Sequence, residues 1–245
     1  KLSQGLIGLG CTRGDVIATL AWNTHRHFES WYGITGLGGV YHTLNPRLFP
    51  EQLSYIINHA NDKVIISDLT FVPILEGIEA DIPCVKHVII MCDKTHMPET
   101  SLKNAICYED LVDAQSGDFN WVKVNETDPC GLCYTSGTTG NPKGVLYSHR
   151  SNVLHTLVSN STDVMGLRSV DTVMPVVPMF HANAWGIAFS APASGAKIVN
   201  PGANMDGESI YELLNNEGVT FTAAVPTVWL MLLQHLEENK LKLPA

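Results

Sequence analysis

The sequence has few basic residues: 15 Lys and Arg stand against 24 Asp and Glu, which gives a formal net charge of −9 at pH 7. A protein that binds a nucleic-acid backbone needs clustered Lys and Arg side chains, and here they are scattered along the chain. We therefore expect no nucleic-acid partner. With 245 residues, 45% of them hydrophobic, the chain can still bury a sizeable core.

The six cysteines lack the spacing of a disulfide framework or a zinc site, which favours a reducing compartment such as the cytoplasm. Cys130 and Cys133 are three residues apart, and on a strand such residues point to opposite faces, so we interpret both as buried thiols. His25 and His27 would be splayed around a helix, and we interpret them as a solvated pair, not as metal ligands.

The chain also lacks a convincing membrane span. Its longest uncharged stretch, residues 172–196, is long enough to cross a bilayer, but it contains three prolines, a histidine and an asparagine. A buried strand, a loop and a helix fit this composition better, and peripheral membrane contact stays open. The chain begins at Lys1 without methionine, which leaves room for an upstream targeting segment.

What the chain does contain is a segment, residues 135–145, that is rich in hydroxyls and glycine and has one lysine but no acidic residue. Glycines remove Cβ where backbone amides must turn toward an anion, and hydroxyls and a lysine add donors and positive charge. These features predict a phosphate-binding loop made of Thr135, Ser136, Gly137, Thr138, Thr139, Gly140, Lys143 and Gly144. The weaker alternative is a flexible hairpin of Gly and Thr.

The segment is not a Walker A loop, because Lys143 follows Pro142 and precedes Gly144 instead of Ser or Thr. Apolar triplets at 132–134 and 145–147 flank it. We therefore expect the loop to join two strands and to hold phosphate without the help of a helix dipole.

Short apolar runs alternate with longer segments in the first half of the chain, at 16–21, 40–43, 64–67 and 88–91. A helix that begins near Pro50 has apolar residues at i, i+3, i+4 and i+7. This alternation predicts an α/β fold, with a mostly parallel sheet covered by helices on both faces.

After the phosphate loop, a helix capped by Ser148 is expected to run to about Val164. A second lobe follows, with strands at 173–177 and 219–224, a helix that ends at Gly218, and another helix at 227–238. We place the first α/β lobe at residues 1–166, and a partial second α/β lobe at residues 167–245.

The string from Thr135 to Val145 resembles the phosphate-binding signature of the adenylate-forming enzymes: acyl-CoA synthetases, luciferases and the adenylation domains of peptide synthetases. Two further stretches look like the same family in the expected order, MFHANAWG at 179–186 and AVPTVW at 224–229. Their combination looks most like the medium- or long-chain fatty acyl-CoA synthetases.

This resemblance implies roles for individual residues. The loop from Thr135 to Lys143 would hold the phosphates of ATP, with a hydroxyl of Thr138 or Thr139 near Mg²⁺. His181 would lie beside the reacting carboxyl, and with Lys143 it is a catalytic candidate. The acyl chain would be walled by His181, Trp185, Gly186, Val225, Pro226, Thr227 and Trp229. From the residues alone, a core or loop histidine and a core tryptophan stay open as alternatives.

The implied activity is that of an ATP-dependent fatty acid–CoA ligase. A carboxylate attacks the α-phosphate of ATP and expels pyrophosphate, and the thiol of coenzyme A then displaces AMP from the acyl adenylate. The family's metal-binding Glu, ribose-binding Asp and C-terminal domain with a catalytic Lys do not appear before Ala245. These 245 residues alone are therefore expected to be inactive in turnover and weak in ATP binding.

Two alternatives remain on the sequence. An adenylating enzyme for an aryl, short sulfur-containing or amino acid would keep the phosphate loop but need a shorter or more polar pocket. A nonenzymatic nucleotide-binding module is the alternative from another class. Acyl chain length, pathway and oligomeric state, including a homodimer, stay open.

Overall fold

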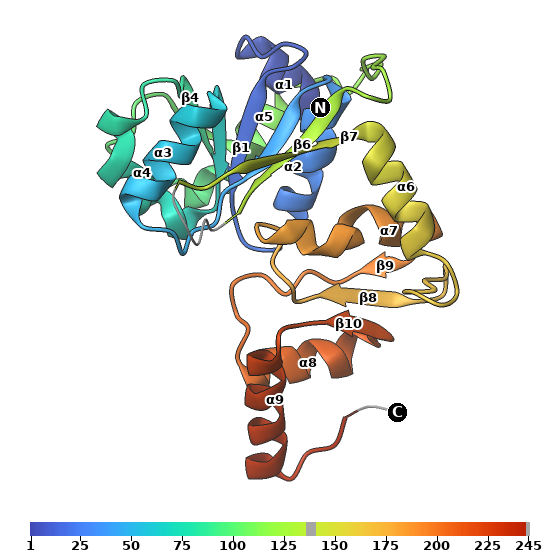
Figure 1. The fold of residues 1–245 in the computed structure, drawn as a ribbon. Coiled ribbons are helices and arrows are strands. Elements are labelled where there is room, and N and C mark those ends of the chain that lie inside the picture. The colour runs from blue at the N-terminus through green and yellow to red at the C-terminus, as the bar shows by residue number, and fades with distance from the viewer. Residues whose placement is uncertain (136–140, 244–245) are drawn as a thin grey trace. The chain divides into compact units, whose positions relative to one another are not determined.

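The computed structural model describes residues 1–135 and 141–243. The chain forms two compact units: unit 1 comprises Lys1–Ala21 and Arg26–Arg150, and unit 2 comprises Trp22–His25 and Ser151–Ala245. Each unit has a sheet of mostly parallel strands flanked by helices, which confirms the predicted α/β fold class (Figure 1). The domain division at residue 166 stays a prediction.

Unit 1 is built on a seven-stranded sheet in the order β5-β4-β3-β1-β2-β6-β7. Neighbouring strands are parallel, except that β7 runs antiparallel to β6. Helices flank the sheet, so the central strands are buried along their length, which explains their near-continuous apolar sequences. The strands are β1 (Val16–Leu20), β2 (Val40–Thr43), β3 (Val64–Ser67), β4 (His87–Ile90), β5 (Ala105–Cys107), β6 (Pro129–Tyr134) and β7 (Gly144–Ser148).

The strands and the helix predicted for the first half are confirmed. β2 and β3 have the predicted bounds, and β1 and β4 differ from them by one residue. α3 begins at Pro50, as expected from its fixed φ, and turns its apolar positions into the core. The other helices of unit 1 are α1 (Leu2–Gly8), α2 (His25–Gly36), α4 (Val72–Ile78) and α5 (Tyr108–Asp113), and α3 ends at Ala60.

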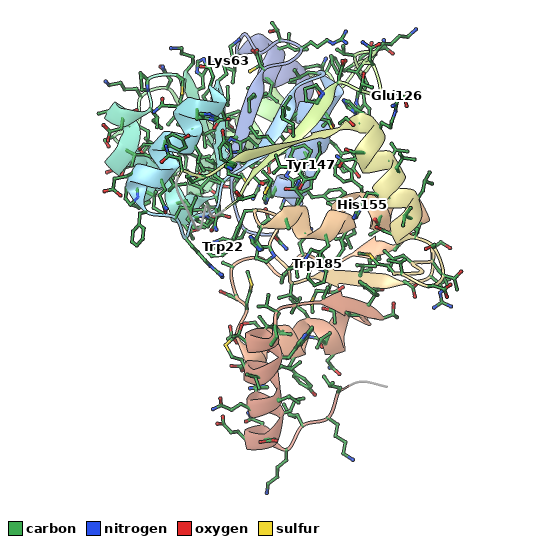
Figure 2. The ribbon with its side chains drawn as sticks, in the orientation of Figure 1. Trp22, Lys63, Glu126, Tyr147, His155 and Trp185 are labelled. Carbon is green, nitrogen blue, oxygen red and sulfur yellow. The ribbon has the colours of Figure 1, made fainter. Side chains whose placement is uncertain are left out.

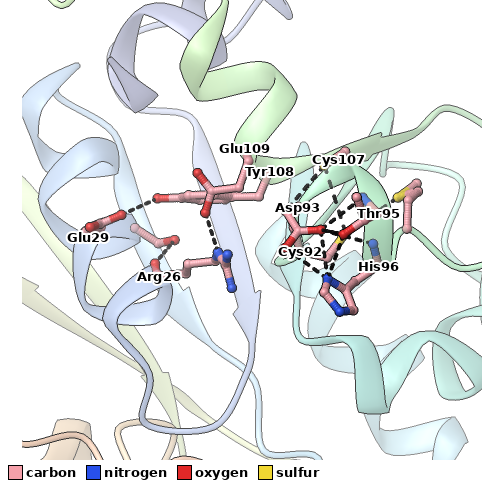
Figure 3. Close-up of polar contacts among 11 residues, drawn as sticks. Arg26, Glu29, Cys92, Asp93, Thr95, His96, Cys107, Tyr108 and Glu109 are labelled. Atoms are coloured by element: carbon pink, nitrogen blue, oxygen red, sulfur yellow. Dashed lines mark hydrogen bonds and ion pairs between the residues drawn. The ribbon is translucent and has the colours of Figure 1, made fainter.

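Polar contacts join α2 to α5 inside unit 1 (Figure 3). Arg26 Nε donates to Glu109 Oε1 at 2.6 Å, and the hydroxyl of Tyr108 donates to Glu29 Oε2 at 3.0 Å. Burial, with the neighbouring Glu29 carboxylate, raises the pKa of Tyr108, so its phenol stays protonated and keeps this donor role.

Unit 2 contains a three-stranded parallel sheet in the order β10-β8-β9. Its elements are α6 (His149–Ser159), β8 (Thr172–Pro175), η4 (Ala182–Gly186), α7 (Ile187–Ser194), β9 (Lys197–Ile198), α8 (Gly207–Glu217), β10 (Phe221–Ala223) and α9 (Pro226–Asn239). The core between sheet and helices consists of Met174, Val176, Val199, Ile210, Leu214, Val228, Leu232 and Leu236. α8 is stopped by Gly218, which follows its last residue and adopts φ 63°, as predicted.

The predicted end of the helix after the phosphate loop is wrong. α6 ends at Ser159, not near Val164. The hydroxyl of Ser161 donates to the carbonyl of Val158 at 2.7 Å, and the side chain of Asn160 donates to Ser190 O. The Ser161 hydroxyl thus competes with a continued helix for one of the last carbonyl groups of α6, while Asn160 bonds to α7 instead.

The prediction that His25 and His27 are both exposed to solvent is also wrong for His27. Its ring is fully buried, with Nε2 3.0 Å from Thr19 Oγ1, and it meets the ring of Trp31 edge-on.

The cysteine interpretation is confirmed, because Cys130 and Cys133 are both buried free thiols on β6. Among the described residues, no helix is long and apolar enough to cross a membrane.

Candidate functional site

The predicted phosphate loop joins two antiparallel strands, as expected: β6 ends at Tyr134 and β7 begins at Gly144. The amide of Thr135 donates to the carbonyl of Lys143 at 3.0 Å, which closes the base of the loop. Thr135, Lys143 and Gly144 are exposed at this base. The remaining predicted loop residues, including both Mg²⁺ candidates, lie outside the described residues: Ser136, Gly137, Thr138, Thr139 and Gly140.

A polar network adjoins the base of the loop, and it is buried at His42 and Asp62 but more exposed at Tyr134 and His59. The hydroxyl of Tyr134 lies 2.6 Å from His59 Nδ1, and the ring of Tyr134 lies 5.1 Å from that of His42. His42 Nδ1 in turn lies 2.8 Å from Asp62 Oδ2, and both side chains are fully buried. Burial raises the pKa of Tyr134 to about 12, so the group beside the loop is a neutral phenol.

Sequence reasoning missed this network. Burial raises the pKa of Asp62, and the neighbouring His42 opposes the rise. His42 and Asp62 are 20 residues apart, and His59 and Tyr134 are 75 apart. No local spacing pattern connects them, and the pairing of β2 with β6 accounts only for the approach of Tyr134 to His42.

The residues that immediately precede two of the predicted stretches meet inside unit 2. Residues 175–186, which we call the His181 segment, leave the carboxyl end of β8, and Val225 follows the carboxyl end of β10. These strands are parallel neighbours, and the amides of Val176 and Val177 donate to Ala223 O at 3.0 and 2.9 Å. The carboxyl ends of parallel strands are the usual place for ligands in α/β sheets.

The His181 segment contains a left-handed helical turn that the sequence did not predict. Five successive residues have positive φ: Ala182 at 45°, Asn183 at 50°, Ala184 at 47°, Trp185 at 56° and Gly186 at 73°. A left-handed conformation costs roughly 1–2 kcal/mol for each residue with a Cβ. Such strain persists only where surrounding contacts hold it, and it is typical of functional sites.

Gly186 is required at the end of this turn for two reasons. Its φ of 73° disfavours any side chain, and a Cβ there would lie 2.7 Å from Nδ1 of His155 on α6. The same His155 nitrogen lies 3.2 Å from Ser159 Oγ, so the ring is held within unit 2 (Figure 2). The contact with His155 was not predicted, because α6 and the turn are separate in sequence.

The other predicted site residues of unit 2 differ in exposure. His181 lies on the surface, and the apolar side chains of Trp185 and Val225 are 48% and 46% exposed. Pro226 and Thr227 are also exposed, at the start of α9. Trp229 instead packs against the core of unit 2. The binding roles of all these residues stay predictions.

The chain matches known proteins along nearly its whole length. The model of a family described as AMP-binding enzyme matches residues 1–244. A medium-chain-fatty-acid–CoA ligase of Ectopseudomonas oleovorans is 48% identical over 229 residues, which are 94% of this chain and 42% of that protein. A 3-methylmercaptopropionyl-CoA ligase of Ruegeria lacuscaerulensis is 46% identical, over 100% of this chain and 46% of that protein.

Solved structures show the same fold. A long-chain-fatty-acid-CoA ligase from Archaeoglobus fulgidus has a TM-score of 0.83 at 24% identity, covering 97% of this chain and 45% of that chain. An anthranilate CoA ligase in complex with anthranoyl-AMP also has a TM-score of 0.83 at 24% identity, covering 93% and 43%. The present chain spans less than half the length of the relatives it matches. It belongs to the AMP-binding enzyme family.

Proposed function

We propose that the full protein is an ATP-dependent fatty acid–CoA ligase. It would activate a medium- or long-chain fatty acid to an acyl adenylate and transfer the acyl group to coenzyme A. The observation that carries this proposal is the 45–48% identity, over 94–100% of the chain, with proteins named as acid–CoA ligases. A cytoplasmic location and a homodimer belong to the same proposal.

The base of the phosphate loop supports a role in holding ATP. Thr135 and Lys143 are exposed where the two strands end, and the backbone bond between them fixes their separation. A lysine and a hydroxyl beside glycines suit an anionic triphosphate. Mg²⁺, held with help from the hydroxyl of Thr138 or Thr139, would supply charge that offsets the phosphates. Lys143 would stabilise negative charge that develops as pyrophosphate leaves.

The surface of unit 2 supports a role in binding the acid. Trp185, in the His181 segment that follows β8, and Val225, just after β10, expose apolar side chains, and Gly186 carries no side chain. An apolar surface of this kind suits an alkyl chain, and His181 would orient its carboxylate by hydrogen bonding. Pro226 and Thr227 would extend the wall, while Trp229 would support it from the core.

A short sulfur-containing acid is the second candidate substrate. The 3-methylmercaptopropionyl-CoA ligase of Ruegeria lacuscaerulensis is 46% identical, and a long-chain-fatty-acid–CoA ligase of Thermus thermophilus is also 46% identical. Overall identity therefore does not separate the two acids. An exposed Trp185 suits a long chain more than a short one, which is why we place the fatty acid first.

A substrate panel tests the proposal. The protein, as its gene encodes it, is incubated with ATP, Mg²⁺, coenzyme A and straight-chain fatty acids of increasing length, with 3-methylmercaptopropionate and benzoate beside them. We expect AMP release and thioester formation that peak with a medium or long chain. A peak at 3-methylmercaptopropionate would select the second candidate, and release with none of the acids would reject both. The 245 residues alone should release no AMP.

A further inference from the structure

The side chain of Asn23 forms three hydrogen bonds to the chain that leads to His181. It is fully buried, and it belongs to unit 2 although β1 and α2 of unit 1 flank it in sequence. Its Nδ2 donates to Pro175 O at 2.8 Å and to Val177 O at 2.9 Å, and its Oδ1 accepts from the amide of Met179 at 2.8 Å. Only a carboxamide supplies two donors and an acceptor at this reach.

These bonds hold the first part of the His181 segment. β8 ends at Pro175, and the following amides of Val176 and Val177 donate to Ala223 O. Asn23 satisfies a different set of backbone groups, the carbonyls of residues 175 and 177 and the amide of residue 179. Between them, Ala223 and Asn23 leave this irregular stretch little freedom before the turn in which the amide of His181 donates to Pro178 O at 3.0 Å.

Asn23 is itself held in place. The amide of Gly202 donates to the carbonyl of Asn23 at 3.0 Å, and the two residues form an antiparallel bridge. The ring of the preceding Trp22 meets Phe180 edge-on, with ring centroids 6.2 Å apart. Residues 22 and 23 therefore contact the His181 segment from its first residue to the neighbour of His181.

We propose that Asn23 is a positioning residue for His181. This inference rests on the proposed function, in which His181 orients the carboxylate of the acid. Among the described residues, the side chain of Asn23 bonds to backbone groups alone, so it acts through the path of residues 175–181. Without its amide, two buried carbonyls and one amide lose their partners, and the segment must shift to find others. A displacement of about 1 Å at a reacting group can cost on the order of 100-fold in rate.

The test uses the full protein and acid-dependent exchange of pyrophosphate into ATP, with kcat and the KM values for acid and ATP measured separately. For Asn23→Ala, we expect kcat to fall by roughly 10- to 100-fold, with the KM for ATP within about 2-fold of the natural protein. Asn23→Ser keeps one donor and is expected to lose less. Asn23→Ser is also the variant to measure if Asn23→Ala does not fold.

A pH profile adds a readout that lost packing alone would not give. Asn23→Asp has the same shape, but a carboxylate facing two carbonyl oxygens repels them, whereas a protonated carboxyl can donate to one of them. Burial favours that protonated form. We therefore expect kcat of Asn23→Asp, relative to the natural protein at the same pH, to rise as the pH is lowered.

The control is Ile210→Val, a substitution in the buried core of the same unit. It should lower Tm by about 2–4 °C and leave kcat unchanged. A natural kcat in both Asn23→Ala and Asn23→Ser, per folded molecule, would overturn the positioning role and leave the proposed function standing. The positioning role would also be overturned if Ile210→Val lowered kcat as much as the two Asn23 variants do. Absence of acid-dependent exchange in the natural protein would overturn the proposed function, and the role of Asn23 with it.

Discussion

The phosphate loop of unit 1 and the His181 segment of unit 2 both begin at the carboxyl end of a strand in a mostly parallel sheet, but different contacts hold them. Thr135 bonds to Lys143, eight residues further on, and the ladder between β6 and β7 continues that contact. The backbone between Pro175 and Met179 instead bonds to the side chain of Asn23, which lies 152 to 156 residues earlier in the chain.

This difference separates two ways of building a binding surface. A loop closed by its own flanking strands can lose a side chain without losing its shape, because backbone bonds define its base. The His181 segment combines a strained left-handed turn with a few distant contacts. We therefore expect changes to exposed side chains of the loop itself, such as Lys143, to affect activity without stability, and changes near the His181 segment to affect both.

The largest expected effect is on stability, at a glycine of the strand that enters the phosphate loop. A Cβ at Gly131 would overlap the ring of Tyr41, which is fully buried and stacked on Trp31 at 4.4 Å. The ring has no room to move, so Gly131→Ala should lower the free energy of unfolding by about 3 kcal/mol. Urea denaturation of the variant and the natural protein measures this change in the free energy of unfolding. Gly77→Ala on α4, where a Cβ meets nothing within 4 Å, is the control and should cause no loss.

A large effect on activity alone is expected at Lys143. Its side chain is exposed, and the bond from Thr135 uses its backbone carbonyl, which Lys143→Ala keeps. Acid-dependent pyrophosphate exchange should slow by about 100-fold, because a preorganised charge at the phosphates is lost. The urea midpoint should not move. Unchanged exchange would remove Lys143 from the mechanism, and a lower midpoint would contradict the contrast between the two regions.

The left-handed turn should show an intermediate effect. Gly186→Ala places a Cβ at φ 73° and 2.7 Å from His155 Nδ1, so it should lower the free energy of unfolding by roughly 1–2 kcal/mol from backbone strain, with a steric contribution beside it. Adding His155→Ala should recover only the steric part. Thermal unfolding of the single and double variants measures both. Full recovery in the double variant would mean that the backbone is not strained.

The smallest expected effect concerns pH. The Arg168 side chain and amide, with the hydroxyl of Thr220, lower the pKa of Asp171 from 3.8 to about 2. A lowered pKa means that the folded protein favours the carboxylate, so this stabilisation is present above the ordinary pKa and is lost as the pH falls toward about 2. The natural protein should exceed Asp171→Asn in urea midpoint at neutral pH, and the gap should close below about pH 4. A gap independent of pH would contradict this.

Much of unit 1 could be predicted from the sequence, because its elements depend on local patterns. β2 and β3 are short apolar runs, α3 starts at a proline, and the phosphate loop lies between two apolar triplets. The end of α6 was missed because the hydroxyl of Ser161 competes for one of its last carbonyl groups. His27 was misjudged because its partner, Thr19, lies on the neighbouring strand β1.

For the candidate site of unit 2, the sequence predicted which residues take part but not the backbone conformation that holds them. The resemblance of the 179–186 stretch to a family pointed to His181 and Trp185. Asn183 tolerates the left-handed conformation, but the alanines on both sides of it disfavour that conformation, so the sequence did not predict a turn of successive left-handed residues. Asn23 carried no signal either, since an isolated asparagine has no spacing pattern and its partners are backbone groups more than 150 residues away.

The most direct test of the central claim is acid-dependent pyrophosphate exchange by the full protein. ATP, Mg²⁺ and labelled pyrophosphate are supplied without coenzyme A, with and without a medium-chain fatty acid. The proposed function predicts label in ATP only when the acid is present, since only acyl adenylate formation is reversible under these conditions. Equal exchange without acid, or none with any acid of the panel, would contradict the claim that this protein activates a carboxylate.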